Sequence, residues 1–291
     1  MKDLIIIGAG PAGVSAVLYA QSRGLDLIIF EKEKIGGLIG KVSKVSHYTS
    51  VIVDEDGESF RKRLEDQINA YKLDLKYEEV TSLKKENDKF IVKTNNKSYE
   101  AKKVIIASGS TPKELDFDTK GYKISHWAKG AEDRVRGKIA IVNGGSDGAA
   151  KEAIYLSNYA KEVHIVQNQD KLLCINEFKK VIENSKNIKV HTSVTLKSLV
   201  KEDNTIKEVI LSSNESIKAD EGVEIFAMIG QYPNTDFIDI DLKKNELGFL
   251  DQDIVSDVEN LYIAGDVRVK DVRQVATAVN DGAIAAIKAS K

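Results

Sequence analysis

The sequence has few of the residues that carry thiol, metal or membrane chemistry. Among its 291 residues there is one cysteine, Cys174, so this chain cannot form an intrachain disulfide, a CxxC redox pair or a multi-cysteine metal site. Its four histidines show no spacing typical of metal ligands, and we expect no metal. No apolar run approaches the roughly 18 residues that a membrane helix needs, so we expect no membrane partner and a cytoplasmic protein.

Neither sign of charge dominates. Lys and Arg number 43 against 45 Asp and Glu, a formal net charge of −2, which gives no global electrostatic reason for binding nucleic acid or anionic lipid. The chain has only 3 prolines and is 42% hydrophobic and 30% charged, which allows a real core and excludes a collagen-like or disordered chain. At roughly 100–200 residues per domain, the length predicts two domains.

The N-terminal segment predicts a strand, a glycine turn, a helix and a second strand. These are expected at 4–7, 8–13, 14–23 and 25–30. In the turn, Gly8, Gly10 and Gly13 allow backbone N–H groups to approach a pyrophosphate at the positive end of the helix. Glu31 follows the second strand, where a carboxylate can accept hydrogen bonds from ribose hydroxyls. A dinucleotide site is predicted; the alternative is a glycine turn that binds nothing.

A second strand–turn–helix–strand pattern lies in the middle of the chain, at 139–142, 143–148, 149–159 and 162–167. Other predicted elements are a helix at 60–71, strands at 77–87, 89–94, 98–101, 103–107, 195–201, 206–212, 223–229 and 261–264, and a final helix at 274–288. Hinges are expected at 108–112 and 230–233. The layout predicts an α/β chain with two Rossmann-like domains, residues 1–113 plus 236–291 and an inserted domain at 114–235.

A family resemblance is carried by the turn 8–13, by Gly36-Gly37-Leu38, and by a tail that runs from Ala264-Gly265-Asp266 through Arg273-Gln274-Val275 to 281–283. These segments resemble the bacterial low-molecular-weight thioredoxin reductases, which are class II pyridine nucleotide-disulfide oxidoreductases. In that family, homodimeric FAD enzymes pass electrons from NADPH through the flavin to a CxxC pair and then to thioredoxin. The resemblance therefore implies FAD, a homodimer and electron transfer between redox partners.

The resemblance also implies the residues of an FAD site. Asp266 is expected to hold the ribityl chain. Arg273, Gln274 and Val275 are expected to present a helix N-terminus to the pyrimidine side of the flavin, where negative charge gathers on reduction. The full expected set is Gly8, Gly10, Pro11, Ala12, Gly13, Glu31, Lys32, Gly36, Gly37, Leu38, His47, Ala107, Ser108, Gly109, Gly265, Asp266, Arg273, Gln274 and Val275.

The chain departs from the family where the redox dithiol should be. By position, residues 125–130 replace the family's CxxC loop, with Trp127 and Gly130 in place of the two cysteines. Ala131 replaces an acidic residue suited to proton transfer. A classical thioredoxin reductase activity is therefore not expected of this chain. Trp127 is either a neighbour of the flavin or a large side chain that fills the space of the lost loop.

The second departure concerns the second nucleotide. Its expected residues are Gly144, Gly145, Ser146, Asp147 and Gln167, and either Asn143 or Ser146 replaces a glycine. Where the family has an HRR-type cluster that binds the 2′-phosphate of NADP, this chain has 167–169, Gln-Asn-Gln. Neutral amides cannot make charge-assisted bidentate bonds to a phosphate, so NADPH is disfavoured. NADH, the ADP half of another nucleotide such as a second flavin, or an empty domain remain open.

Two smaller features concern partners and sulfur. The segment 129–138 contains four basic residues (Lys129, Arg134, Arg136 and Lys138) and two acidic ones (Glu132 and Asp133). Its excess of positive charge either docks an acidic redox carrier or belongs to a solvated loop. Cys174 lies between apolar residues and is expected to be structural.

These observations predict an FAD-dependent oxidoreductase without its own redox dithiol, in which the flavin performs the chemistry and no protein side chain is catalytic. Electrons would pass between the flavin and an external carrier, such as ferredoxin, flavodoxin, NADH or a second nucleotide cofactor. One alternative is a non-catalytic flavin or nucleotide sensor or scaffold. Another is a dithiol supplied by a partner protein.

Overall fold

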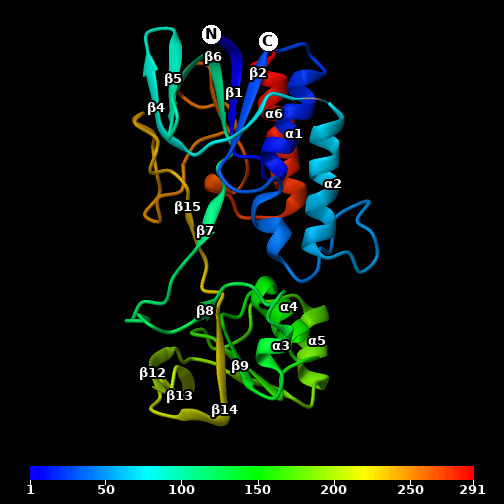
Figure 1. Cartoon of the computed structure of the whole chain (residues 1–291), viewed down its shortest axis with the longest axis vertical. Helices are drawn as coiled ribbons and strands as arrows, with labels where there is room; N and C mark the ends of the chain where they lie inside the picture. Colours follow the sequence, from blue (N-terminus) through cyan, green and yellow to red (C-terminus); the bar gives the residue numbers. More distant parts are fainter. Residues whose placement is uncertain (72) are drawn as a thin grey trace. The chain divides into compact units, whose positions relative to one another are not determined.

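The computed structural model describes residues 1–71 and 73–291 (Figure 1). It divides into two compact units. The first contains Met1–Lys41, Val45–Thr111 and Tyr232–Lys291, and the second contains Val42–Lys44 and Pro112–Gln231. The second unit is thus inserted into the sequence of the first.

The first unit is built on a sheet with the strand order β3-β2-β1-β6-β5-β4, to which β16 adds beside β6. Strands β1, β2, β3, β6 and β16 are parallel. The strands are β1 (Lys2–Ile7), β2 (Leu27–Glu31), β3 (Leu75–Tyr77), β4 (Val80–Glu86), β5 (Lys89–Thr94), β6 (Ser98–Ile106) and β16 (Leu261–Ile263). The helices are α1 (Pro11–Gln21), α2 (Gly57–Ala70) and α6 (Val275–Ala289), with short 3-10 turns η1 (Gly37–Lys41) and η2 (Gly265–Val267).

Both faces of this sheet are buried, as expected of parallel strands. Along β1, Leu4 and Ile6 pack into a core with α1 and α6, whereas Ile5 and Ile7 pack into a second core with Leu83 and residues of β5. In Figure 1, α1 and α6 run side by side, and Ser15 Oγ on α1 donates to the carbonyl oxygen of Val279 on α6 at 2.7 Å.

The second unit repeats the plan, with the strand order β11-β10-β9-β14-β13-β12 and β8 beside β14. Its strands are β8 (Ile124–Ser125), β9 (Ile139–Asn143), β10 (Glu162–Val166), β11 (Ile188–His191), β12 (Leu196–Glu202), β13 (Thr205–Leu211) and β14 (Ser216–Ala227). Its helices are α3 (Glu132–Val135), α4 (Asp147–Leu156) and α5 (Asn176–Asn184). The predicted α/β class with two Rossmann-like units is confirmed.

Several element boundaries differ from the sequence predictions. The strands predicted at 98–101 and 103–107 form one strand, β6, because its start pairs antiparallel with β5 while its end pairs parallel with β1. Helix α1 begins at Pro11 rather than Val14, since proline suits the first helical turn. The strand predicted from 223 begins at Ser216, where β14 pairs with β13. The expected hinges contain β7 (Ser110–Pro112) and β15 (Gln231–Pro233), which pair with each other.

Two absences hold within 1–71 and 73–291. None of the helices there has both the length and the apolar character needed to cross a bilayer. Nor do three or more His, Cys, Asp or Glu side chains of that part of the chain gather as metal ligands would.

Candidate functional site

The first glycine turn packs so tightly that side chains are excluded at two positions. Gly8 has φ +100°, and a Cβ there would lie 2.4 Å from the carbonyl oxygen of Ala107. A Cβ on Gly13 would lie 1.8 Å from the carbonyl oxygen of Gly8. Gly10 differs, because a Cβ there would meet nothing within 4 Å. The turn therefore has open space at the N-terminus of α1, where the helix dipole and backbone N–H groups favour an anion.

Glu31 is fixed beside this turn. Its Oε2 accepts the Ala9 N–H at 2.9 Å, and its Oε1 accepts the Glu33 N–H at 2.8 Å. A carboxylate has about four acceptor positions, so these bonds orient Glu31 and leave it able to accept from a ribose.

Gly36 and Gly37 lie against the same turn. The Ala9 carbonyl oxygen accepts the Gly36 N–H at 2.7 Å, and a Cβ on Gly37 would lie 3.7 Å from Gly10 Cα. The chain leaving β6 lies there too, since the Ala107 N–H donates to the Ile7 carbonyl oxygen at 2.8 Å. The structure thus brings three predicted segments together around the glycine turn.

Asn234 is a residue that the sequence analysis missed. Its Nδ2 donates to the Ser108 carbonyl oxygen at 2.8 Å, and Ser108 Oγ donates to the Asn234 carbonyl oxygen at 2.7 Å. The Asn234 N–H also donates to the carbonyl oxygen of Gly109. These bonds fix the predicted segment 107–109; the only hint in the sequence is the turn-forming Pro233-Asn234 pair.

The C-terminal tail completes the cluster. Gly265 has φ +80°, and a Cβ there would lie 2.9 Å from Ala12 Cβ; a Cβ on Gly282 of α6 would lie 2.0 Å from the Ala12 carbonyl oxygen. Turn η2 and helix α6 therefore meet the start of α1 directly. Next to Gly265, Asp266 Oδ1 is buried with no hydrogen-bond partner in the described chain, and burial raises the pKa of this carboxyl. A buried acceptor without a partner is costly, and a ligand hydroxyl would satisfy it.

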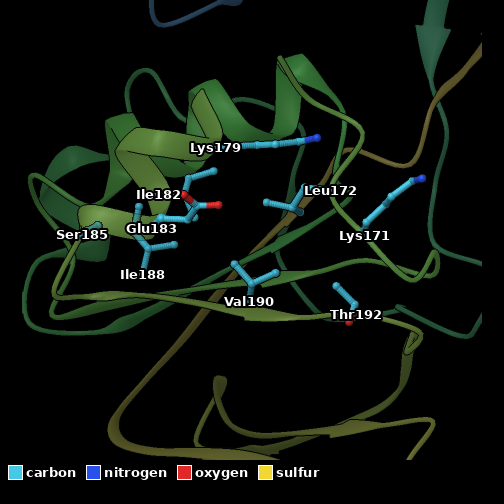
Figure 2. A pocket seen from close by; sticks show the side chains of 9 residues that line it. All are labelled: Lys171, Leu172, Lys179, Ile182, Glu183, Ser185, Ile188, Val190 and Thr192. Carbon is cyan, nitrogen blue, oxygen red and sulfur yellow. The ribbon is translucent and has the colours of Figure 1, made fainter. Parts of the chain in front are cut away.

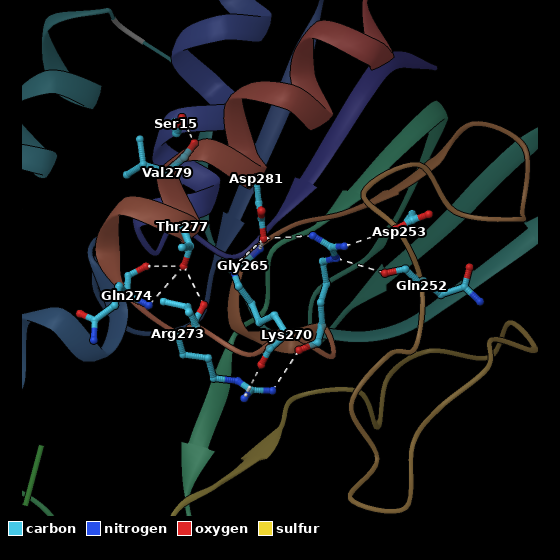
Figure 3. A network of polar contacts seen from close by, with 12 residues as sticks. Ser15, Gln252, Asp253, Gly265, Lys270, Arg273, Gln274, Thr277, Val279 and Asp281 are labelled. Atoms are coloured by element: carbon cyan, nitrogen blue, oxygen red, sulfur yellow. Dashed lines mark hydrogen bonds and ion pairs between the residues drawn. The ribbon is translucent and has the colours of Figure 1, made fainter. Parts of the chain in front are cut away.

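The start of α6 is held by its own side chains (Figure 3). The Gln274 N–H donates to Thr277 Oγ1 at 3.2 Å. The Arg273 guanidinium lies 4.2 Å from the centre of the Phe249 ring and donates to the carbonyl oxygens of Lys270 and Arg268, each at 3.1 Å. The Arg273 side chain thus stabilises its own loop, and Val275 opens the helix.

The roles of three further expected FAD-site residues stay predictions. His47 is exposed with φ 58°, Lys32 forms an ion pair with Glu79 at 3.7 Å, and Leu38 is half-buried in η1. Trp127 is half-buried and belongs to the second unit.

The second glycine turn repeats the contacts of the first. A Cβ on Gly144 would lie 2.3 Å from the Met228 carbonyl oxygen, and its N–H donates to the Val166 carbonyl oxygen at 2.8 Å. Gly144 therefore corresponds to Gly8, whose N–H donates to the Phe30 carbonyl oxygen at 2.8 Å. In this register Ser146, the N-cap of α4, takes the place of Gly10. Of the two candidates, Ser146 rather than Asn143 therefore stands at a glycine position, and Ala149 takes the place of Gly13.

The same register makes Gln167 the counterpart of Glu31. Its side chain is buried against Gly145, donates from Nε2 to the Lys171 carbonyl oxygen at 3.4 Å, and accepts the Asn168 N–H at 3.1 Å. The following segment folds over the turn, because the Leu173 N–H donates to the Gly145 carbonyl oxygen and Asp147 Oδ1 accepts the Ile175 N–H, each at 2.8 Å. A neutral amide thus occupies the position where the first turn has a carboxylate.

The segment predicted to replace the redox loop is held from several sides. His126 Nδ1 lies 3.0 Å from the Ala227 carbonyl oxygen, and Arg134 donates to Ser125 Oγ at 2.6 Å. Arg134 and Lys138 also share the Glu224 carboxylate, at 2.7 and 2.8 Å. Glu224, from β14, therefore offsets part of the positive charge expected in 129–138.

The single thiol is inert by its surroundings. The Cys174 side chain is 4% exposed in the core of the second unit, and burial raises the pKa of its thiol. Little thiolate therefore exists at neutral pH, which agrees with the structural role expected for it.

Glu152 on α4 is a second buried group that the sequence analysis missed. It is 3% exposed; its Oε1 accepts the Ser43 N–H at 3.1 Å, while Oε2 has no partner in the described chain. Burial raises the pKa of this carboxyl. The signal in the sequence was a glutamate on the alanine-rich face of α4 that packs into the core.

A separate cavity of about 410 Å³ lies in the second unit, between α5 and β11 (Figure 2). Ile182 of α5 faces Ile188 and Val190 of β11 across it, and the side chains of Lys171 and Lys179 extend at the end nearest Leu172. None of the residues predicted to bind a cofactor lines it.

Comparison with known proteins agrees with this geometry. Residues 2–282 match the family described as pyridine nucleotide-disulphide oxidoreductase, and the chain belongs to that family. A thioredoxin reductase of Peptoclostridium acidaminophilum is 31% identical over 99% of this chain and 96% of that protein. A 34.2 kDa protein in a rubredoxin operon of Clostridium pasteurianum is 29% identical with the same coverage. The crystal structure of Lactococcus lactis thioredoxin reductase (FR conformation) is 25% identical, with a TM-score of 0.93 over 99% of this chain and 98% of that one.

The fold and the matches together define a flavin-dependent oxidoreductase. Within that class, this protein is thioredoxin reductase-like. FAD fits the residues of the first unit, because the turn has open space at the N-terminus of α1 and Asp266 has a buried oxygen without a partner.

Proposed function

We propose that this protein exchanges electrons directly between FAD and an external carrier, without a redox dithiol of its own. The observation that carries the proposal is the thiol count: Cys174 is the single cysteine of the chain, and it is buried. A thioredoxin reductase-like flavoprotein with this sequence has no second sulfur with which to form an internal disulfide.

The residues of the first unit have defined parts in this proposal. The glycine turn and the start of α1 bind the pyrophosphate, Glu31 accepts from a ribose, and Asp266 accepts a ribityl hydroxyl. The start of α6 favours the negative charge that gathers on the pyrimidine side. When bound, FAD supplies the hydride and one-electron chemistry, and the side chains bind and orient it and hold water away.

For the carrier, we propose NADH or a small redox protein such as ferredoxin or flavodoxin, rather than NADPH. Gln167, Asn168 and Gln169 offer amides where the 2′-phosphate of NADPH needs cations. The name of the Clostridium pasteurianum relative places that protein in an operon with rubredoxin, which supports a small redox protein as partner. A homodimer is proposed from the family resemblance. The second candidate is a nucleotide bound in the inserted unit. The residues that would bind it are Gly144, Gly145, Ser146, Asp147 and Gln167.

Anaerobic reduction of the flavin-loaded protein tests the proposal. NADH, NADPH and reduced ferredoxin are each mixed with the protein while the flavin absorbance is recorded. We expect bleaching by NADH or by reduced ferredoxin, and slower bleaching by NADPH. Flavin that no donor reduces would support a sensor or scaffold instead, and reduction that requires a dithiol-bearing partner would support a dithiol in trans.

A further inference from the structure

Asp281 is the centre of a buried polar cluster that includes the backbone N–H of Gly265, the residue before Asp266 (Figure 3). It lies on α6, is 5% exposed, and receives three donors on one oxygen. Its Oδ2 accepts the Gly265 N–H at 3.0 Å and the Lys270 ammonium at 2.9 Å, and Arg268 Nη1 lies 3.3 Å from it. The ammonium of Lys270 is itself largely buried, so this ion pair is little screened by water.

Asp266 is in the same loop, and two cations act on it without bonding to it. Burial has the largest effect on the pKa of Asp266 and raises it; the charges of Lys270 and Arg273 lower it, and the charge of Asp281 raises it. Oδ1 of Asp266 still has no hydrogen-bond partner in the described chain. Both cations have other partners: Lys270 bonds to Asp281, and Arg273 bonds to two carbonyl oxygens and lies over Phe249.

We propose that Asp281 is a positioning residue that holds Lys270 away from Asp266, so that Asp266 stays available for a hydroxyl of the FAD ribityl chain. The inference rests on the proposed function. If Lys270 paired with Asp266, the cofactor would have to break a buried ion pair before binding. A site that is already arranged for FAD avoids that cost and therefore binds FAD more tightly.

A double-mutant cycle tests this role. Asp281→Asn retains an oxygen that can accept the Gly265 N–H but loses the charge that holds Lys270. We expect FAD affinity of the apoprotein, measured by quenching of flavin fluorescence, to fall tenfold or more. Lys270→Met alone should change affinity little, and adding it to Asp281→Asn should restore most of the loss, because the competing cation is gone. Asp271→Asn, an exposed acid in the same loop, is the matched control and should bind as wild type does.

The carboxyl signal of Asp266 in ¹³C NMR gives a readout that needs no FAD. In the wild-type apoprotein we expect a pKa above the ordinary 3.8, to which the charge of Asp281 contributes directly. Asp281→Asn should lower it. Lys270→Met should raise it more in the Asp281→Asn background than in the wild type, because only in that background does Lys270 pair with Asp266. A wild-type pKa at or below 3.8 would overturn the proposal even if Asp281→Asn fails to fold, because it would mean that the carboxylate of Asp266 is stabilised by a partner in the apoprotein.

The possible outcomes separate the two proposals. Wild-type affinity in Asp281→Asn, or a loss that Lys270→Met does not restore, would overturn the role of Asp281 while leaving the FAD site intact. Failure of the wild-type apoprotein to bind FAD at all would overturn the proposed function itself.

Discussion

Glu31 and Gln167 occupy the same position in two copies of one motif. In each copy, the carbonyl oxygen of the preceding residue, Phe30 or Val166, accepts the N–H of the first turn glycine at 2.8 Å. Each side chain lies against the residue after that glycine, Ala9 or Gly145. The two units therefore share the geometry of this turn but differ in charge at the position that would face a ribose.

This difference predicts how to change nucleotide preference. Replacing Asn168 and Gln169 by arginines should shift the preference from NADH to NADPH, because guanidinium groups bond bidentately to a phosphate. Charge-assisted bonds contribute about 1.5–3 kcal/mol each, so about tenfold or more is expected in the ratio of dissociation constants. Replacing both by glutamate is the matched control and should weaken NADPH binding. Equal preference in both variants would show that 168–169 do not lie near the 2′ position.

Gly10 and Gly13 separate cofactor binding from folding. Gly13→Ala forces a Cβ to within 1.8 Å of the Gly8 carbonyl oxygen, so the free energy of unfolding of the apoprotein should fall by about 1–3 kcal/mol or more. Gly10→Ala meets nothing in the protein and needs no unusual φ, so the apoprotein should unfold at nearly the same temperature. Its Cβ would occupy space next to the pyrophosphate, and FAD affinity should fall about tenfold, or about 1.4 kcal/mol. Unchanged FAD affinity in Gly10→Ala would place the cofactor elsewhere.

The first site was largely predictable because its signals are local. A buried strand, glycines at fixed spacing and an acid after the next strand are adjacent in sequence, and the structure brings Gly8, Gly10, Gly13 and Glu31 together as that pattern indicates. The register of the second turn was ambiguous in the sequence, because Asn143 and Ser146 are both small and polar. The Met228 carbonyl oxygen above Gly144 resolves it, and that contact joins β14 to β9, which are far apart in sequence.

What sequence patterns could not predict depends on tertiary contacts. Asp281 has the spacing of an ordinary helix residue, and its role arises because α6 carries it to Gly265 and Lys270. Asn234 matters because β15 pairs with β7, which brings Asn234 next to Ser108. The surplus charge of 129–138 could not be judged from that segment alone, since Glu224 comes from β14.

Asp266 predicts a pH dependence of FAD binding. Burial raises its pKa, and a ribityl hydroxyl donates more strongly to the carboxylate than to the protonated acid, so binding should lower that pKa and release a proton. FAD affinity should therefore rise as pH increases toward the raised pKa of the free protein, and level off above it. Asp266→Asn should lose this dependence and bind FAD more weakly by about 1.5–3 kcal/mol, measured by fluorescence titration across pH. Parallel pH profiles for both proteins would contradict the assignment.

The stacked pair His164 and His191 predicts acid sensitivity of the second unit. His164 Nδ1 lies 2.8 Å from His191 Nε2, so the pair shares one proton, and burial lowers the pKa of both rings. Glu162 contacts His164 and pairs with Lys189, and Glu215 acts on His191; both carboxylates oppose the lowering.

The sign of that effect follows from proton uptake on unfolding. Below the ordinary histidine pKa of 6.5, the unfolded chain binds protons that the folded pair does not. As the pH falls, the free energy of unfolding should therefore decrease by up to about 1.4 kcal/mol per pH unit for each histidine. In His164→Gln, the free energy of unfolding, measured by urea unfolding, should change less between acidic and neutral pH than in the wild type. A slope equal to that of wild type would mean that the pair does not titrate on unfolding.

Reoxidation of the flavin without sulfur tests the central claim most directly. Flavin-loaded wild type and Cys174→Ala are reduced anaerobically, then mixed in a stopped-flow instrument with oxidised ferredoxin, flavodoxin or NAD⁺ while the flavin absorbance is followed. We expect at least one of these carriers to reoxidise the flavin at the same rate in both proteins. Reoxidation that disappears with Cys174, or flavin that stays reduced in both proteins with every carrier, would contradict direct exchange.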